Sequence, residues 1–312
     1  MCILQRSFHL LSLVTRKNNL ITGRNPERIY MLSFINIPKH IRTFKFIVAT
    51  LVKNRELIWE LTKKEIYDRY TGQVFGILWT IGHPLFLMGI YIFVFSFIFE
   101  MKMGGTVELP RNYPTFLLAG VIPWLTIQET MMRSCTSVIS QANLVKQVVF
   151  PIEILPVKSA LSSFVSQVIF TLLFMVYIFI VYRSLPWTFM LVPVLFLFQN
   201  LTFFGVSFLF SAISVFFRDL KDFVYVFCTA GLYILPIIYP PERIPEKFKP
   251  VFMPVLYINP ISYIIWCYQD VFYFGRIEHP WAWVVFGSMS LVMFYSGYYV
   301  FNRLKTIFGN VL

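Results

Sequence analysis

Apolar residues gather into six long segments along the chain, and polar stretches separate them. The segments cover residues 77–99, 116–137, 160–182, 191–217, 223–239 and 281–301. A helix of about 20 predominantly apolar residues crosses the hydrocarbon core of a bilayer. Each segment reaches or approaches that length. The pattern predicts an all-α membrane protein with six transmembrane helices, in a domain that spans residues 76–302.

A charged, helix-favouring run precedes the first apolar segment. Trp59, Ile66 and Tyr70 fall on one side of a helix here, and aromatic and basic residues together favour the membrane surface. Glu60 with Lys64, and Glu65 with Arg69, are spaced as i,i+4 ion pairs. We therefore expect an amphipathic interfacial helix over residues 54–75. Residues 1–53 are expected to form a partly disordered amino-terminal extension.

The long stretch between the fifth and sixth segments does not resemble an ordinary external loop. It begins with turn-forming residues at 240–245, and residues 251–274 are then apolar and aromatic. Pro254, Pro260 and Asp270 oppose a seventh continuous membrane helix. We expect two short re-entrant helices that enter and leave the membrane from the outside.

Lys and Arg residues near the segment ends set the orientation. Twelve of them lie on the side of both termini and of the loop that begins at Asn143, and seven lie on the other side. Because cytoplasmic loops carry the excess of basic residues, both termini are predicted to be cytoplasmic, including a short tail over residues 303–312.

Composition excludes several classes of function. Hydrophobic residues make up 57% of the chain and charged residues 13%, whereas soluble domains carry about a quarter charged residues. The net charge of +12 is spread over loops and not gathered into one surface, so we expect no nucleic-acid partner. The four cysteines match no metal or redox spacing, and no phosphate-binding G-x-x-x-x-G-K-[ST] loop occurs. An enzyme with a metal or a nucleotide on this chain is not indicated.

The loop between the second and third segments carries a short amphipathic pattern. Its apolar residues are Leu144, Val145, Val148 and Val149, which recur on one face of a helix. Asn143 is placed to cap this helix, and Pro151 ends it because proline donates no helical N–H. Such a helix either docks a partner subunit or rests on the membrane surface.

Charged residues at two further places are candidates for function. Glu129 and Arg133 lie four residues apart in the second apolar segment, where they form an intrahelical pair facing protein or line a polar path. Arg218, Asp219 and Asp222 fall in the tight turn between the fourth and fifth segments. Asp219 is placed to cap the next helix, and Asp222 lies near its positive end.

Aromatic residues exceed what membrane spanning requires, with 35 Phe, 17 Tyr and 7 Trp. Most of them are explained by contact with lipid and by interfacial belts. Pro123 interrupts helical bonding beside Trp124, which would hold that ring rigidly near the outer half of its segment. Trp124, Tyr233 and Tyr239 are therefore hypothesised to line a path for a sugar, or else to anchor helices at the interface.

Several short motifs resemble the membrane subunits of ATP-binding-cassette transporters that export polysaccharides, namely the O-antigen, capsule and teichoic acid exporters. They occur in the same order from about residue 55 to the end of the chain. The matching stretches are residues 61–66, 69–70, 76–79, 142–146, 149–151, 153–156, 217–220, 236–239 and 259–260. His83 and Pro84 stand where the family usually has Asn-Pro.

The resemblance implies a homodimer in a bacterial inner membrane, with two separate ATPase subunits that hold ATP and Mg²⁺. The cargo would be a lipid-linked polysaccharide that moves between the protomers. The residues implied in coupling to the ATPase are Asn143, Leu144, Val145, Val148, Val149, Pro151, Ile154 and Leu155. A secondary transporter would show clustered ionisable residues at mid-membrane and internal repeats, and a membrane transferase would show grouped carboxylates or histidines. Neither pattern is evident.

Overall fold

The computed structural model describes residues 49–95, 110–146, 150–241 and 244–312. All regular secondary structure in these ranges is helical, which agrees with the predicted all-α class. The chain divides into two compact units, residues 1–55 and 56–312. Most of the first unit, and with it most of the predicted amino-terminal extension, lies outside the described residues.

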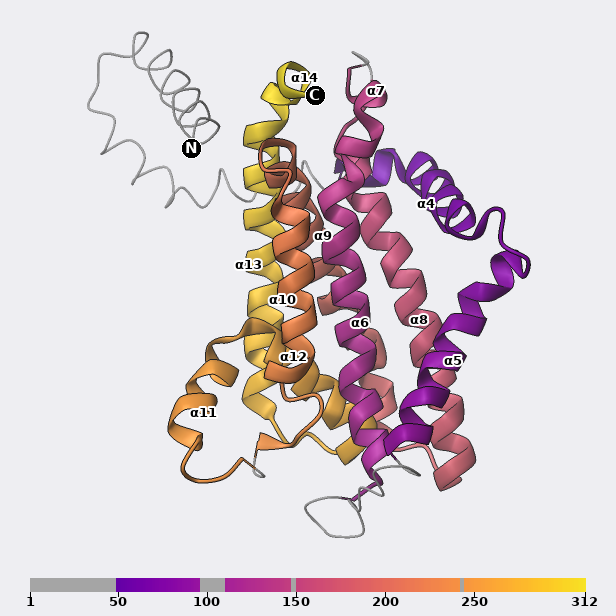
Figure 1. Cartoon of the computed structure of the whole chain (residues 1–312), viewed down its shortest axis with the longest axis vertical. Helices are drawn as coiled ribbons and strands as arrows, with labels where there is room; N and C mark the ends of the chain where they lie inside the picture. The colour runs from indigo at the N-terminus through magenta and orange to yellow at the C-terminus, as the bar shows by residue number, and fades with distance from the viewer. Residues whose placement is uncertain (1–48, 96–109, 147–149, 242–243) are drawn as a thin grey trace. The chain divides into compact units, whose positions relative to one another are not determined.

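Seven longer helices form the unit (Figure 1). They are α4 (Arg55–Tyr70), α5 (Trp79–Phe93), α6 (Tyr113–Ser137), α8 (Ile154–Tyr182), α9 (Val192–Phe216), α10 (Leu220–Ile234) and α13 (Pro280–Leu304). Short helical turns connect some of them, including η1 (Gly76–Leu78), η3 (Ile139–Gln141), α7 (Ala142–Val145) and η4 (Trp187–Leu191). At the carboxyl end come η7 (Lys305–Ile307) and α14 (Phe308–Val311). The predicted tail after residue 302 is therefore largely helical.

Four described stretches are long and apolar enough to cross a membrane: Gly76–Phe93, Ile154–Tyr182, Trp187–Phe216 and Pro280–Ile307. The other two predicted spans correspond to α6 and α10. The helix α10 has only 15 residues, and α6 has 25 but carries polar and charged side chains along its second half. Most of α6 is nonetheless buried, because α5, α8, α9, α10 and α12 (Pro260–Gln269) all pack against it.

The helices α9 and α13 lie side by side along their lengths (Figure 1). Among the described glycines, Gly205 and Gly297 of this pair lie closest to the backbone of a neighbouring helix. A Cβ atom on Gly297 would lie 2.1 Å from the carbonyl oxygen of Gly205, and one on Gly205 would lie 2.4 Å from the backbone of Met293. Small residues permit such contact between membrane helices. The ring of Phe208 then packs against Tyr298 and Phe301, with ring centroids 5.4 and 5.3 Å away.

The stretch between α10 and α13 is bent and not one straight helix. The helix α11 (Lys249–Ile258) meets the combined α12 and η6, a π-helical turn at Asp270–Phe274, at 90°. Asn259 lies at the bend, where its side-chain oxygen accepts a hydrogen bond from the Ile261 N–H at 3.0 Å. Pro260 supports the break because it begins α12 without a backbone N–H to donate. A seventh straight span is excluded, as the sequence indicated.

Buried polar side chains fix α12 and η6 to the long helices. Gln167 on α8 donates to the hydroxyl of Tyr268 on α12 at 3.0 Å and accepts from Thr126 on α6. The carboxylate of Asp270 is fully buried and accepts from the backbone N–H of His279 at 3.1 Å and from Trp283 Nε1 at 3.0 Å. Unpaired polar groups are costly in a membrane interior, so these bonds hold the bent segment in one place.

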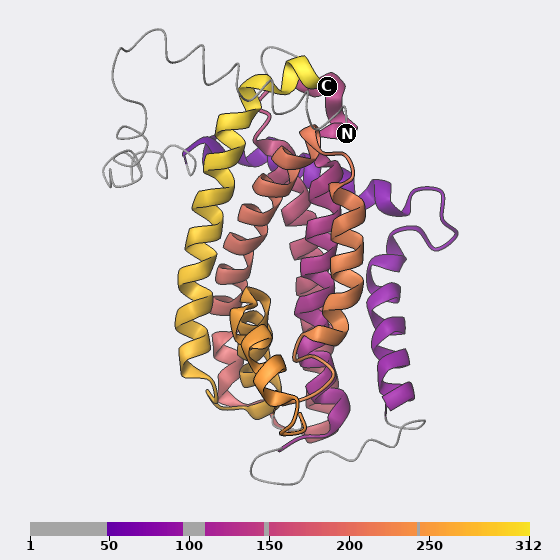
Figure 2. The same ribbon diagram turned by 60° about the vertical axis from the view of Figure 1, so that its left-hand side comes forward.

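The two ends of the bundle carry different elements. Figures 1 and 2 both show α7, α14 and the turn between α9 and α10 at one end, with α11 toward the other. The carboxyl terminus and the loop that begins at Asn143 therefore share an end, in agreement with the predicted topology.

Gly297→Ala should destabilise the folded protein by about 1–3 kcal/mol, because an added methyl group collides with backbone that cannot move aside. Thermal unfolding of the purified protein in detergent measures the change. Gly89→Ala is the matched control, since a Cβ at that helical position meets nothing within 4 Å. Equal melting temperatures for Gly297→Ala and the control would contradict the close crossing of α9 and α13.

Candidate functional site: a charge network beside the amino-terminal helix

The helix α4 lies across the ends of α6 and α8, whereas α5 runs along them (Figure 1). Its buried side is formed by Ile58 and Thr62. On the side that was predicted to face the membrane, Trp59 is 51% exposed, while Ile66 and Tyr70 are half-buried; the membrane contact stays a prediction. Contact with neighbouring helices decides which positions of α4 are buried. The spacing of residues within α4 does not predict these contacts.

The predicted ion pairs within α4 do not form as expected. Glu60 pairs with Lys63 at 2.7 Å and not with Lys64. Glu65 and Arg69 pair with residues of other helices and not with each other. Same-helix spacing identified charged residues that can interact, but the charges on α6 and α8 are nearer partners.

Glu129 on α6 is held between two arginines. Its Oε1 atom lies 2.7 Å from Nη2 of Arg69 on α4 and 2.9 Å from Nε of Arg133 one turn away on α6. Arg69 also donates to two serine hydroxyls of α8, Ser162 at 2.8 Å and Ser166 at 3.1 Å. One guanidinium thus joins three helices.

Glu65 makes the second set of contacts. Its Oε2 atom lies 3.2 Å from Nζ of Lys158 on α8, and its Oε1 atom lies 3.7 Å from Nη1 of Arg133. The hydroxyl of Ser159 donates to the same carboxylate at 3.4 Å. We call Glu65, Arg69, Glu129, Arg133 and Lys158 the charge network. Its three cations and two carboxylates leave one net positive charge.

Glu129 and Arg133 form the predicted intrahelical pair, and this pair faces protein, because both side chains also contact α4. The alternative, a polar path lined by the pair, stays a prediction. Their side chains are 23% and 29% exposed, so the pairing is neither fully screened by water nor fully buried. Sequence analysis did not single out Lys158 or the serines of α8, although Ser159, Ser162 and Ser166 recur on one helical face as small residues do at helix contacts.

Two cavities flank the charge network. The end groove, of about 350 Å³, is lined by α4, η3, α7 and the start of α8, and includes Lys64, Asp68, Gln141, Leu144 and Leu155. The side cavity, of about 510 Å³, lies between α5 and the pair α6 and α8. Arg69 and Arg133 line both of them.

The predicted coupling helix is shorter and begins earlier than expected. It is the four-residue α7, which starts at Ala142 and follows the 3-10 turn η3 directly. Asn143 lies inside α7 and is exposed, so its predicted capping role is wrong; Gln141 occupies the cap position. The side chain of Leu144 lines the end groove, and Val145 is buried. Val148 and Val149 lie outside the described residues.

The remaining coupling residues lie at the start of α8. Ile154 and Leu155 are buried, and Pro151 is half-buried just before the helix. The carboxylate of Glu153, which sequence analysis did not single out, pairs with Nζ of Lys305 at the end of α13. This contact connects the coupling segment with the carboxyl-terminal helix.

The turn between α9 and α10 contains Arg218 and Asp219, and Asp222 follows within α10; all three are exposed. Asp219 occupies the cap position of α10 as predicted, but its side chain makes no capping hydrogen bond. Asp222 lies in the first turn of α10, where a carboxylate interacts favourably with the positive end of the helix.

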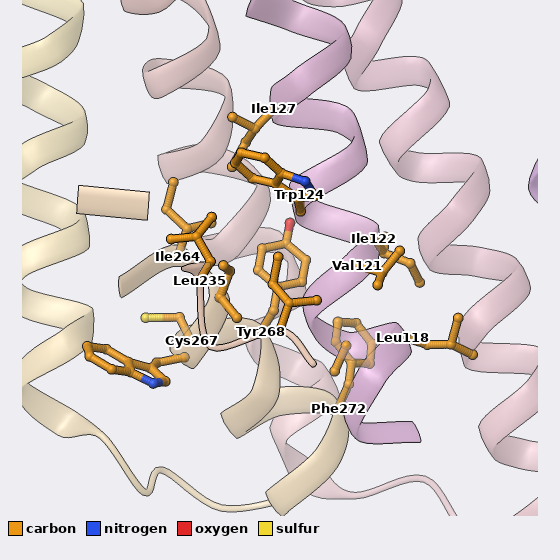
Figure 3. Packing of buried hydrophobic residues seen from close by; sticks show 14 of the residues in the cluster. Leu118, Val121, Ile122, Trp124, Ile127, Leu235, Ile264, Cys267, Tyr268 and Phe272 are labelled. Carbon is orange, nitrogen blue, oxygen red and sulfur yellow. The ribbon is translucent and has the colours of Figure 1, made fainter. Parts of the chain in front are cut away.

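The three aromatic residues of the hypothesised sugar path are not equivalent. Trp124 is 1% exposed, and its ring lies so close to Gly231 on α10 that a Cβ there would meet it at 2.4 Å. Figure 3 shows this ring among other buried apolar side chains. Tyr233 is 66% exposed, and Tyr239 is half-buried with its hydroxyl donating to the Ile234 carbonyl at 2.8 Å. The path itself stays a prediction.

Arg111, just before α6, anchors the opposite end of the bundle. Its guanidinium donates to the Phe272 carbonyl and lies 5.0 Å from the ring of Tyr182, and the Tyr273 hydroxyl donates to the Arg111 carbonyl at 3.0 Å. Burial lowers the pKa of Arg111, and the phenols of Tyr182 and Tyr273 oppose that shift. An arginine stays charged even so.

Cys135, Cys228 and Cys267 are buried and free, and Cys2 lies outside the described residues. Within the described ranges, no group of three or more His, Cys, Asp or Glu residues is placed to hold a metal ion.

The pair Arg69–Glu129 should contribute a coupling energy of about 1–2 kcal/mol, since it is partly buried and joins two helices. A double-mutant cycle with Arg69→Gln and Glu129→Gln, followed by denaturant unfolding in detergent, measures it. The matched control is the cycle for Lys63 and Glu60, whose side chains are 50% and 67% exposed, with about 0.5 kcal/mol or less expected. Equal coupling energies in the two cycles would show that the charge network adds no stability.

The chain is similar to known membrane transport proteins along most of its length. A permease of the O-antigen export system from Klebsiella pneumoniae, RfbA, is 29% identical over 259 residues, covering 82% of this chain and 95% of that protein. The RfbA permease of Myxococcus xanthus is 25% identical over 264 residues, covering 84% and 98%. The family model described as ABC-2 type transporter matches residues 56–273, which include α4, the charge network and the bent segment. The chain belongs to the ABC-2 type transporter family.

Proposed function

We propose that the chain is the membrane permease of an ATP-driven exporter that moves a lipid-linked polysaccharide of the O-antigen type across a bacterial inner membrane. Both relatives carry the name of O-antigen export permeases, and the alignments cover almost their whole length. The sequence contains no phosphate-binding loop. ATP would therefore be hydrolysed on two separate ATPase subunits.

The observation that carries this proposal is the charge network beside α7 and α4. A subunit that bound at this end would contact α7 and the end groove. The guanidinium of Arg69 and the carboxylate of Glu65 link α4 to α6 and α8. A displacement of α4 would then move two membrane helices with it. Ion pairs and hydrogen bonds are directional, so they transmit motion between helices better than apolar packing does.

The topology belongs to the same proposal. We place the end that carries α7 and α14 in the cytoplasm, because basic residues concentrate there. The six spans are then α5, α6, α8, α9, α10 and α13, with α4 at the cytoplasmic interface. The helices α11 and α12 enter and leave from the outside as re-entrant helices.

A second copy of the chain would complete the path for the cargo. One face of α10 is buried through Val224, Cys228 and Gly231. Its other face exposes large side chains, among them Phe223 at 74%, Val226 at 66% and Tyr233 at 66%. A homodimer that places this face beside the channel would give Tyr233 access to a polysaccharide.

Leu144→Asp should reduce binding of the ATPase by about tenfold or more, because a carboxylate replaces an apolar side chain at the centre of the proposed interface. Co-purification with the ATP-binding-cassette subunit of the same exporter, co-expressed with the permease, measures the loss. Leu144 is preferable to the buried Val145, where a charge would disturb the fold. Asn302→Asp adds the same charge at the same end on α13, where the side chain is exposed. Undiminished binding of the ATPase to Leu144→Asp, with normal export, would refute the docking role.

Trp124→Leu and Tyr233→Leu should affect different properties of the protein. The first removes a buried ring and should lower stability by about 1–3 kcal/mol, whereas the second changes an exposed side chain and should stay within about 0.5 kcal/mol. If Tyr233 contacts the polysaccharide, its variant should export less at normal membrane levels. Thermal unfolding and an export assay separate the two properties. Normal export by Tyr233→Leu would remove Tyr233 from the path.

A further inference from the structure

The side cavity has the size and position of a binding site. Its volume of about 510 Å³ lies within the range of about 300–1,000 Å³ that is typical of small-molecule sites. One wall is α5, which belongs to the apolar stretch Gly76–Phe93. Only 11% of this stretch is buried, compared with 33–44% of the most apolar part of the three other long stretches. The cavity therefore lies next to a helix that is exposed along most of its surface.

The polar part of the cavity has unused hydrogen-bond donors. The guanidinium of Arg69 uses Nη1 and Nη2 for Ser166, Ser162 and Glu129, yet within the described part of the chain its buried Nε atom has no partner. The buried hydroxyl of Thr80 on α5 has none there either. Both residues line the side cavity. An N–H donor of a cation without an acceptor is a favourable contact for an anion.

The charges around this cavity favour an anion overall. Glu129 lines it as well, but its carboxylate already accepts from both Arg69 and Arg133. The charge network keeps one net positive charge. Gln73 and Gln128 add neutral amides to the same wall, and their donors suit phosphate oxygens.

The rest of the lining is apolar, and the polarity changes along the helices. On α6, Arg133 and Glu129 lie toward the end that carries α7, and Leu125 lies about 12 Å deeper than Arg133. On α8, Ser166 is followed by Phe170 one turn deeper, and on α5 the deepest lining residue is Leu87. A polar head at one end and an apolar chain beyond it match this gradient.

We propose that the side cavity binds the phosphate headgroup of a membrane lipid, with the phosphate at Arg69 and the apolar chain along α5. Two lipids share this chemistry: a bilayer phospholipid and the polyprenyl phosphate part of a carrier. Assignment to the carrier rests on the proposed export function, whereas the phosphate-lipid site does not.

Binding to the purified full-length permease, in a neutral detergent and followed by native mass spectrometry, tests this site. The probes are phosphatidylglycerol and polyprenyl phosphate, with diacylglycerol and polyprenol as the corresponding lipids that lack phosphate. Wild-type protein should bind each phosphate lipid about tenfold or more tightly than its neutral counterpart.

Gln128→Glu should weaken binding of both phosphate lipids by about tenfold, because it adds a negative charge to the cavity wall. Gln73→Glu provides a second variant at an exposed position, which keeps the test valid if Gln128→Glu does not fold. The matched control is Ser140→Glu, which adds the same charge at an exposed position of the end groove and not of the side cavity. A larger loss for polyprenyl phosphate assigns the site to the carrier, and equal losses assign it to lipid phosphate in general.

The proposal is overturned if the neutral lipids bind as tightly as the phosphates, or if the glutamate variants and the Ser140→Glu control behave alike. That failure is distinct from failure of the export function. If lipid binding fails these tests while co-purification of the ATPase and export stay normal, the lipid site is removed and the permease assignment stays intact.

Discussion

Glu129 occupies a position at which a carboxylate is unfavourable unless a cation accompanies it. It lies on the membrane helix that the other helices surround, and two arginines satisfy it, one from its own helix and one from α4. Moving a carboxylate out of water costs free energy, and only close, hydrogen-bonded cations offset that cost. The position of α4 follows from this requirement, because Arg69 reaches Glu129 only when α4 lies across α6 and α8. The end groove and the side cavity exist on either side of that contact.

Polar contacts hold the opposite end of the molecule as well. The bent segment α11–α12–η6 is fixed by Asn259 at the bend, by Tyr268 to Gln167 in the bundle, and by Asp270 to the start of α13. Each of these hydrogen bonds pairs a polar group that lipid chains cannot pair. The two ends therefore differ in kind. Carboxylates pair with arginine and lysine near α7, whereas the charged Arg111 and Asp270 near η6 bond mainly to backbone groups and neutral side chains.

Hydropathy predicted where the long apolar helices lie, since a membrane leaves the chain little other choice. Pro254, Pro260 and Asp270 predicted that residues 251–274 are not one continuous helix, and the break lies at Pro260. Same-helix spacing did not predict the partners of Glu65 and Arg69, because those partners come from segments far away in sequence. Trp124 illustrates a further limit. Residues 116–125 of its helix carry no polar side chain, so the pattern could not distinguish a ring that faces a path from one that packs against Gly231.

The low burial of α5 has a consequence for motion. The pair α9 and α13 is in backbone contact at Gly205 and Gly297, so separating these helices would open empty space between them. By contrast, only 11% of the apolar stretch Gly76–Phe93, which contains α5, is buried within the chain. A shift of α5 would therefore break few contacts within the chain. The same bundle pairs a helix contact that glycine makes tight with a helix that few contacts inside the chain restrain.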